Sequence, residues 1–335
     1  MKTQTKAALF LLFFAPINAE LLSASSPPIE FFFPTTFVFL TLFYGTGVLL
    51  VHEFAVRWGK GWPTIMLLGL AYGVIEEGLV TMSFFNSSWP GIGHLGTYGN
   101  FLGINWTWCV NLSIFHGVWS ISVPILVMRL IFPSVDGQAI LWRRPFIAAL
   151  MTFPVVSFLL MLSTVVVTGY LAPPLQYLGA VTMVVLLVLL ARGAPYRLLA
   201  VPGERPSRSA SRFSLVGFCF SAGFFLLMYL VPFLVPFPFI PIALMICLTA
   251  AAARYFEKNL GISGNDRQKW AMFVGLEIVF VGWTFTHEFA PAISNTRGMA
   301  LVGTVYFIFF VWLKMRIDRR TGGTSMLQPQ QTPPA

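Results

Sequence analysis

The chain has 335 residues, of which 57% are hydrophobic, 16% aromatic and only 10% charged, and its mean hydropathy is +0.78. In a soluble domain about a quarter of the residues are charged, so this composition excludes a soluble globular protein. It predicts an all-α, polytopic transmembrane bundle in the lipid bilayer. The apolar runs are long and continuous, which excludes a β-barrel with its short alternating strands.

The net charge of +9 has a topological explanation. Lys and Arg fall in every second connection between the apolar runs, and Arg297 is the only exception. They lie at Lys2, Lys6, Arg57, Lys60, Arg129, Arg143 and Arg144, and within 192–212, 254–269 and 314–320. This positive-inside pattern predicts a multi-pass protein of the plasma membrane with a cytoplasmic C-terminus. Because the charge follows topology, we expect no nucleic-acid partner.

About ten spans are predicted, each about 17 to 25 residues long and thus able to cross a bilayer. In chain order they cover 7–22, 35–55, 63–85, 107–132, 145–170, 175–192, 213–233, 236–255, 270–290 and 298–316.

The first segment, 1–22, has two interpretations. Lys2 and Lys6 precede a short apolar core that Pro16 interrupts, and the core ends at Ala19 before Glu20. This pattern fits a secretory signal as well as a first transmembrane helix. The chain has ten spans if the segment is retained and nine if it is cleaved.

The rest of the chain divides by composition. Residues 23–192 form a first membrane bundle, and 213–316 form a second one. Between them, 193–212 is basic and rich in Pro and Ser, which is typical of a cytoplasmic linker. Residues 317–335 are predicted to be a disordered cytoplasmic tail. The outer loop 86–106 lacks Lys and Arg; its aromatic residues favour an interfacial belt, and its glycines also fit a lid over a cavity.

The third span carries two adjacent glutamates, which are costly to place in hydrocarbon. Gly69, Gly73, Glu77 and Thr81 follow at four-residue steps and therefore share one helix face. The two glycines form a small-residue surface on which another helix can pack closely. Glu77 is thus predicted to point into the bundle, and Glu76 to border that face.

The fourth span runs back inward and carries a polar stripe. Asn105, Cys109, Ser113, His116 and Ser120 recur at intervals of three and four residues, which predicts a polar cavity beside this helix. At a rise of about 1.5 Å per residue, the glutamates and His116 both lie in the outer half of the membrane. The ninth span brings His287 to the outer end, somewhat higher.

These groups support different chemistries. Two carboxylates in a low dielectric share a proton, so the pair can act as general base and acid towards a water. His116 can then stabilise developing negative charge. The same groups can load protons or bind a cation in a transporter, or simply hydrogen-bond across helices in an assembly protein.

The adjacent glutamates, followed about forty residues later by a helix with His, resemble the CAAX-protease and bacteriocin-processing intramembrane endopeptidases. That superfamily has the motifs Glu-Glu-x-x-x-Arg and Phe-x-x-x-His, and a third motif of His with Asn or Asp. Glu76, Glu77 and His116 match the first two. Thr81 stands in place of the Arg and Leu112 in place of the Phe, and His287 is followed by Pro291 where Asn or Asp is expected.

The resemblance implies metal-independent peptide hydrolysis by a glutamate-activated water. On this basis Glu76, Glu77 and His116 are the candidate catalytic residues, and Thr81, Asn105, Ser113 and His287 are candidate supporting residues. No metal or other cofactor is expected. The substrate would be a membrane-embedded peptide or a small molecule. A proton-coupled transporter and a non-catalytic membrane assembly protein remain the alternatives.

Overall fold

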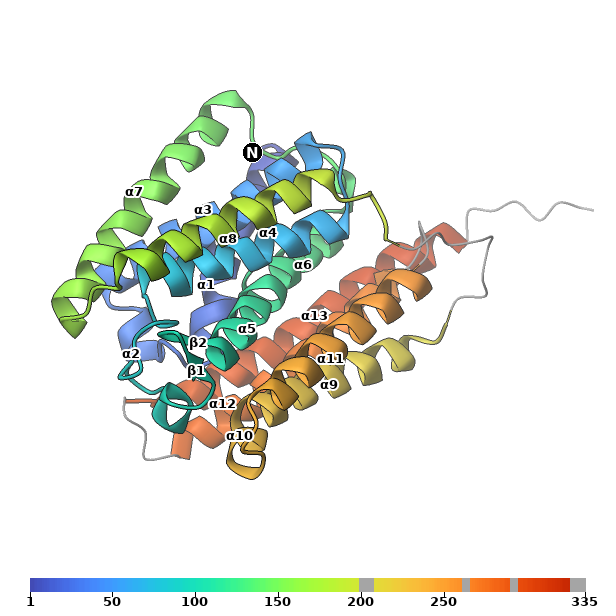
Figure 1. The fold of residues 1–335 in the computed structure, drawn as a ribbon. Coiled ribbons are helices and arrows are strands. Elements are labelled where there is room, and N and C mark those ends of the chain that lie inside the picture. Colours follow the sequence, from blue (N-terminus) through green and yellow to red (C-terminus); the bar gives the residue numbers. More distant parts are fainter. Residues whose placement is uncertain (199–207, 261–265, 290–294, 326–335) are drawn as a thin grey trace, which may run out of the picture.

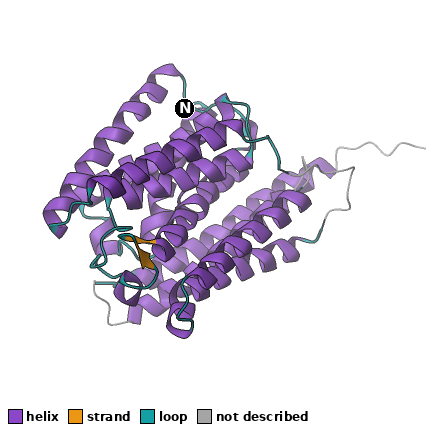
Figure 2. Cartoon of the chain, viewed as in Figure 1, coloured by secondary structure: helices purple, strands orange, loops and turns teal. Residues whose placement is uncertain are grey.

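The computed structural model describes residues 1–198, 208–260, 266–289 and 295–325, with side chains as far as Thr321. The described chain is a helical bundle with one two-residue hairpin (Figures 1 and 2). Within it, nine helices are long and apolar enough to cross a membrane. The prediction of an all-α polytopic bundle is therefore confirmed.

The first part of the chain, up to the predicted linker, contains eight α-helices and the hairpin. Its elements are α1 (Thr3–Pro16), η1 (Ile17–Leu21), α2 (Pro28–Phe31), α3 (Pro34–Arg57), α4 (Trp62–Val74), η2 (Ile75–Val80), η3 (Gly93–Gly96), β1 (Asn100–Phe101), β2 (Ile104–Asn105), α5 (Trp106–Phe115), η4 (His116–Ser122), α6 (Val123–Ile131), η5 (Pro133–Val135), α7 (Arg143–Thr168) and α8 (Pro174–Gly193).

The second part contains α9 (Ala210–Phe225), η6 (Leu226–Leu230), α10 (Val231–Leu234), α11 (Phe239–Asn259), α12 (Asp266–Phe289) and α13 (Met299–Ser325). The labels η3 and η5 denote 3₁₀ turns. The labels η1, η2, η4 and η6 denote π-helical turns, in which the backbone bonds reach one residue further than in an α-helix.

Prolines mark the starts of many helices. Because proline lacks an N–H and has a fixed φ, it suits the first helical turn. It occupies this turn in α2, α3, α4, α6, α8 and α10. At its C-terminal end, α7 is closed by Gly169, whose φ of 66° is the left-handed conformation that glycine adopts most readily.

Nine of the ten predicted spans agree with the nine candidate membrane helices, with shifts at their ends; the first, 7–22, falls on α1 and η1, which are not among those nine. The third span ends as a helix at Val80 rather than at 85, and α13 continues to Ser325, so the predicted disordered tail 317–335 is helical over its first part. Residues 326–335 lie outside the described chain. Of the predicted linker 193–212, Gly193 belongs to α8 and 210–212 belong to α9, while 199–207 lie outside the described residues.

The N-terminal segment is built into the bundle. Its helix α1 packs against α3 and α6, and Ala7, Leu11 and Ala15 are fully buried. Phe14 stacks near Tyr306 of α13, with ring centroids 6.1 Å apart. The segment thus forms part of the core, and its retention in the mature protein stays a prediction.

The two predicted membrane bundles share one core. Trp119 of η4 is fully buried, and its ring lies 5.6 Å from that of Phe220, 4.9 Å from that of Phe224 and 5.4 Å from that of Phe280. These three phenylalanines belong to α9 and α12, which lie side by side with α11 and α13 in Figure 1. The second group of helices therefore packs directly on the helix that bears His116.

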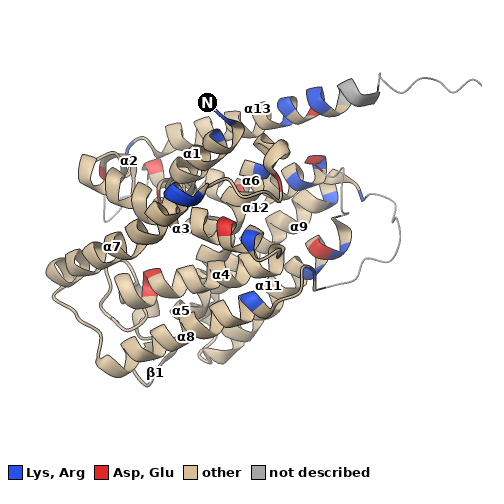
Figure 3. Cartoon of the chain, turned by 90° about the horizontal axis from the view of Figure 1, so that it is seen from above, with Lys and Arg blue, Asp and Glu red and all other residues tan. Residues whose placement is uncertain are grey.

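The surface divides into a lipid-facing belt and a charged end. The helices α7 and α8 expose most of their large apolar side chains. Lys and Arg gather towards the end of the bundle that holds the N-terminus and the end of α13 (Figure 3), and Arg297 remains the exception. That the charged end faces the cytoplasm stays a prediction.

At the charged end, a buried carboxylate ties α3 to the connection before α7. Glu53 is fully buried, and its Oε1 accepts hydrogen bonds from the backbone N–H groups of Ile140 (2.7 Å) and Leu141 (2.9 Å). Its Oε2 accepts a hydrogen bond from Nε of Arg57 at 2.8 Å. Glu53 therefore holds the fold at this end and is separate from the Glu76–Glu77 pair.

Candidate functional site

Three of the π-helical turns carry polar side chains that meet inside the bundle. Glu20 lies on η1, Glu76 and Glu77 lie on η2, and His116 and Ser120 lie on η4. A π turn holds one residue more than an α turn and often occurs at functional sites. Here each π turn re-aims the side chains that an uninterrupted α-helix would distribute differently around its axis.

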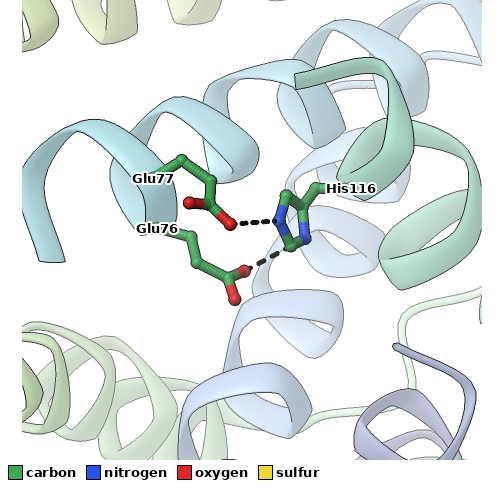
Figure 4. A group of neighbouring side chains, drawn as sticks. All are labelled: Glu76, Glu77 and His116. Carbon is green, nitrogen blue, oxygen red and sulfur yellow. Dashed lines mark hydrogen bonds and ion pairs between the residues drawn. The ribbon is translucent and has the colours of Figure 1, made fainter. Parts of the chain in front are cut away.

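The centre of the site is the imidazole of His116, which lies between the two glutamates (Figure 4). Its Nε2 lies 3.1 Å from Oε1 of Glu77, and its Nδ1 lies 3.1 Å from Oε2 of Glu76. Nδ1 also lies 2.9 Å from Oγ of Ser120. The side chains of Glu76 and His116 are 8% and 4% exposed, and that of Glu77 is 12% exposed. Glu77 is therefore the more accessible carboxylate.

The second oxygen of Glu77 is held by hydroxyl groups. Its Oε2 accepts hydrogen bonds from Oγ1 of Thr81 at 3.0 Å and from Oγ of Ser83. Ser83 in turn accepts a hydrogen bond of 3.0 Å from the indole N–H of Trp108. These contacts fix the carboxylate so that its other oxygen faces His116.

The second oxygen of Glu76 is held by a tyrosine. The hydroxyl of Tyr44, on α3, contacts both Oε1 of Glu76 and Oε1 of Glu20. A phenol has one proton and can donate one hydrogen bond. For both contacts to be hydrogen bonds, one of the two glutamates must be protonated. Glu20 also accepts a hydrogen bond of 2.8 Å from Oγ of Ser26.

Glycines allow the helix with the glutamates to approach the helix with the histidine. A Cβ at Gly69 would lie 2.9 Å from Cα of Gly117, and one at Gly73 would lie 3.0 Å from Cα of Ser113 and 3.1 Å from Cβ of His116. Real Cβ atoms essentially never show the first of these distances, and the other two are tighter than most real Cβ contacts. The predicted small-residue packing surface is therefore confirmed, and it faces the helix that carries His116.

Two polar atoms at the site are buried without a hydrogen-bond partner. They are Oε2 of Glu76, which faces His116, and the hydroxyl of Tyr72, whose ring centroid lies 6.0 Å from that of His116. A buried polar atom without a partner is costly. The ligand atoms of Glu76, Glu77 and His116 all lie within 4.8 Å of one another, which is within reach of one metal ion.

The structure places the predicted supporting residues differently from one another. Thr81 contacts Glu77 directly. Asn105 is instead the N-cap of α5: its side chain accepts a hydrogen bond of 2.9 Å from N–H of Trp108 and donates one to the carbonyl of Leu95. Ser113 packs its backbone against Gly73. Asn105 and Ser113 therefore position the helix of His116 and lie outside its circle of polar contacts.

His287 lies in a different environment. Its Nδ1 is 3.1 Å from the carbonyl oxygen of Trp283, and its ring packs on that of Trp283 with centroids 4.9 Å apart. Its carbonyl accepts a hydrogen bond from Thr296. Among the described residues these are its polar and ring contacts, so it does not join His116. Pro291 lies outside the described residues.

The outer loop and the residue before it are tied to neighbouring elements. The hydroxyl of Tyr98 donates a hydrogen bond of 2.7 Å to the carbonyl of Val235, and that of Tyr170 donates one of 3.0 Å to the carbonyl of Phe85. Tyr98 is buried, whereas Trp106 is exposed. Part of the loop is thus packed against its neighbours. Two surface hollows lie beside α13, lined by Trp312 and Asp318 among others, and neither borders His116.

Glu20, Tyr44 and Ser83 belong to the site but were not predicted from the sequence. Glu20 had a signal, because it is a charged residue at the end of a predicted span. Tyr44 and Ser83 had no such signal in the sequence, since hydroxyl-bearing residues are common in apolar runs. Their role follows only from the packing of η1, α3 and η2 around His116.

A family model described as an uncharacterized membrane protein family matches residues 9–327. No curated protein and no solved structure matches the chain. The match begins within α1 and extends to the end of α13 and beyond, so it includes every helix that contributes to the site. The chain therefore belongs to this uncharacterized family of multi-pass membrane proteins.

Proposed function

We propose that the chain is an intramembrane hydrolase that cleaves peptide bonds of membrane-embedded polypeptides with a water activated by Glu77. The observation that carries this proposal is the imidazole of His116, held between two carboxylates inside the helix bundle. The matches of Glu76, Glu77 and His116 to the CAAX-protease and bacteriocin-processing motifs support the same reaction class.

In the proposed reaction, Glu77 takes a proton from water as the water oxygen attacks the carbonyl carbon of the scissile peptide. Glu77 is suited to this role because it is the more accessible carboxylate. An N–H of His116 then donates to the oxyanion of the tetrahedral intermediate. Glu77 returns its proton to the leaving nitrogen, the C–N bond breaks, and the products are a carboxylate and an amine.

The remaining groups position this machinery. Glu76 holds the imidazole from its Nδ1 side, and Tyr44 and Glu20 hold Glu76. The buried hydroxyl of Tyr72, which has no hydrogen-bond partner, is a second donor available to the oxyanion. Because these side chains are buried, part of the bundle around them must move to admit a substrate.

The test follows oxygen from the solvent. The purified chain is reconstituted with membranes of a source strain that lacks its gene, in water enriched in ¹⁸O. Hydrolysis places one ¹⁸O atom in each new C-terminal carboxylate, which peptide mass spectrometry detects. We expect labelled termini with the wild-type chain, and a loss of at least about 100-fold with Glu77→Gln, since a general base contributes about 10²–10⁴-fold.

The matched control is Glu277→Gln. Glu277 is also a fully buried glutamate, but it lies on α12 and accepts a hydrogen bond from Asn18 at 3.2 Å. This variant should retain labelling. Equal labelling by the wild-type chain and folded Glu77→Gln, or none by the wild-type chain, would contradict the proposed hydrolase.

One observation favours a proton-coupled transporter as the second candidate. Glu20, Tyr44, Glu76, His116 and Glu77 form a continuous series of proton-exchanging contacts. Such a series can carry protons as well as activate water. This function predicts acidification of liposomes down a substrate gradient, lost in Glu76→Gln, without any ¹⁸O-labelled termini.

A further inference from the structure

We propose that Glu76, Glu77 and His116 bind one divalent transition-metal ion, with Zn²⁺ as the ion of choice. The site uses the same side chains as the proposed hydrolase and rests on that function in a metal-bound form, in which Glu77 and His116 would be ligands instead of general base and oxyanion donor. Its test, however, measures bound metal rather than hydrolysis, so either proposal can fail while the other stands.

The first argument is the identity of the facing atoms. Oε1 of Glu77, Oε2 of Glu76 and a ring nitrogen of His116 point towards one another (Figure 4) and lie within 4.8 Å of one another. Carboxylate oxygen and imidazole nitrogen are both Zn²⁺ ligands, at about 2.0 to 2.2 Å. Ligands at that distance lie about 3 to 4 Å apart, so binding draws the three side chains together by about 1 Å.

The second argument is the set of groups behind these ligands. Each carboxylate presents one oxygen to the centre, while hydroxyl groups hold the other: Tyr44 for Glu76, and Thr81 and Ser83 for Glu77. The ring of His116 likewise has Ser120 beside its Nδ1, so Nε2, which lies 3.1 Å from Oε1 of Glu77, is the nitrogen that would bind the ion. Outer hydrogen bonds of this kind orient metal ligands and fix the histidine tautomer.

The third argument is a buried carboxylate oxygen without a hydrogen-bond partner. Oε2 of Glu76 belongs to a residue that is only 6% exposed, faces the cluster, and has no hydrogen-bond partner. Its contact with His116 is an ion pair at 3.1 Å and requires a charged ring. A bound cation would satisfy this oxygen and allow the imidazole to remain neutral.

The fourth argument is charge. Among the described residues, the ion pairs of Glu76 and Glu77 are both with His116. When Glu20 carries the proton that the two Tyr44 contacts require, a single imidazolium leaves one charge of the Glu76–Glu77 pair uncompensated in the interior of the bundle, which is costly. A divalent ion with two carboxylates and a neutral imidazole gives a neutral site. Three protein ligands also leave a coordination position for water, as in catalytic zinc sites.

The test is the metal content of the full-length chain in lipid nanodiscs. The protein is stripped with a chelator, loaded with Zn²⁺, freed of excess ion, and measured by plasma mass spectrometry. We expect about one Zn²⁺ per wild-type chain. Zn²⁺ affinity should fall at least about 100-fold in His116→Ala and in Glu77→Gln, because each loses a ligand. Loading with Co²⁺ should give the visible absorption of a low-coordinate site.

His287→Ala and Glu277→Gln are the matched controls, since neither side chain contacts the three ligands. Both should bind Zn²⁺ as the wild type does. A wild-type chain without stoichiometric Zn²⁺, or equal binding by folded His116→Ala, would overturn the metal site. Labelled termini from a wild-type chain that holds no stoichiometric Zn²⁺ would overturn the metal site and leave the hydrolase standing. Bound Zn²⁺ without labelled termini would support the metal site and contradict the hydrolase.

Discussion

Glu20 and Glu76 share the hydroxyl of Tyr44, although Glu20 lies on η1 and Glu76 on η2, with α3 and α4 between them in the chain. The contact joins η1, α3 and η2 at one point and connects the N-terminal segment to the functional site. A residue that lies in none of the sequence motifs thus sets the position of one that does.

Replacing Tyr44 by Phe tests this connection. The change removes one hydroxyl and leaves the aromatic packing with Phe43 and Tyr72 intact. We expect hydrolysis and Zn²⁺ affinity to fall by about 10- to 100-fold, as is typical for a group that orients a ligand. Tyr229→Phe, on η6, is the control. Unchanged values for both readouts in Tyr44→Phe would show that the hydroxyl does not position Glu76.

The N-terminal segment is expected to be retained in the mature chain. Its Ala7, Leu11 and Ala15 are fully buried, and Asn18 donates a hydrogen bond of 2.7 Å to the carbonyl of Trp119. Loss of the segment would open the core and remove Glu20. Mass spectrometry of the protein from native membranes should therefore detect peptides that precede Ala19, and a chain that begins at Glu20 would contradict this expectation.

Substitution of Gly73 by Ala should displace His116. The added methyl group would overlap Cα of Ser113 and Cβ of His116, so the two helices must separate by a few tenths of an ångström. We expect about tenfold weaker Zn²⁺ binding, since site geometry is sensitive to small displacements. Gly179→Ala on α8 is the control, because nothing lies within 4 Å of its added Cβ. Equal binding by both variants would refute the argument.

Glu53 should matter for stability and not for the site. In Glu53→Ala, Arg57 and the N–H groups of Ile140 and Leu141 lose their acceptor. The two N–H groups are then donors without a partner, which costs about 1 to 3 kcal/mol for each buried group, whereas the side chain of Arg57 is 37% exposed and can be hydrated. Thermal unfolding in detergent should show a clear loss of stability, whereas the exposed Glu30→Ala should show little. The folded fraction of Glu53→Ala should still bind Zn²⁺; loss of binding there would place Glu53 in the site.

Much of the fold was predictable because the membrane imposes it. Long apolar runs mark the helices, and prolines mark several of their starts. The four-residue spacing of Gly69, Gly73 and Glu77 also predicted which face packs against the helix of His116. This prediction was possible because residues four apart lie on the same face of any α-helix. In the structure all three residues contact the helix of His116.

The rest depended on features that periodicity does not encode. Glu76 was predicted to border the packed face, but the π turn at Ile75–Val80 directs both glutamates to His116. Asn105 follows the spacing of the polar stripe and is instead a helix cap. Glu20 and Tyr44 come from other helices, so their contact with Glu76 depends on tertiary packing alone.

A π turn arises when one residue is inserted into an α-helix, and it reverts when one residue is lost. Deleting one apolar residue at 78–80 would restore regular winding and rotate the residue that follows by about 100° relative to Glu77. Thr81, the first residue after this turn, would then lose its contact with Glu77, although no polar residue had been mutated. Relatives of this chain could thus gain or lose the entire polar centre through changes in length, without any change in its chemical residues.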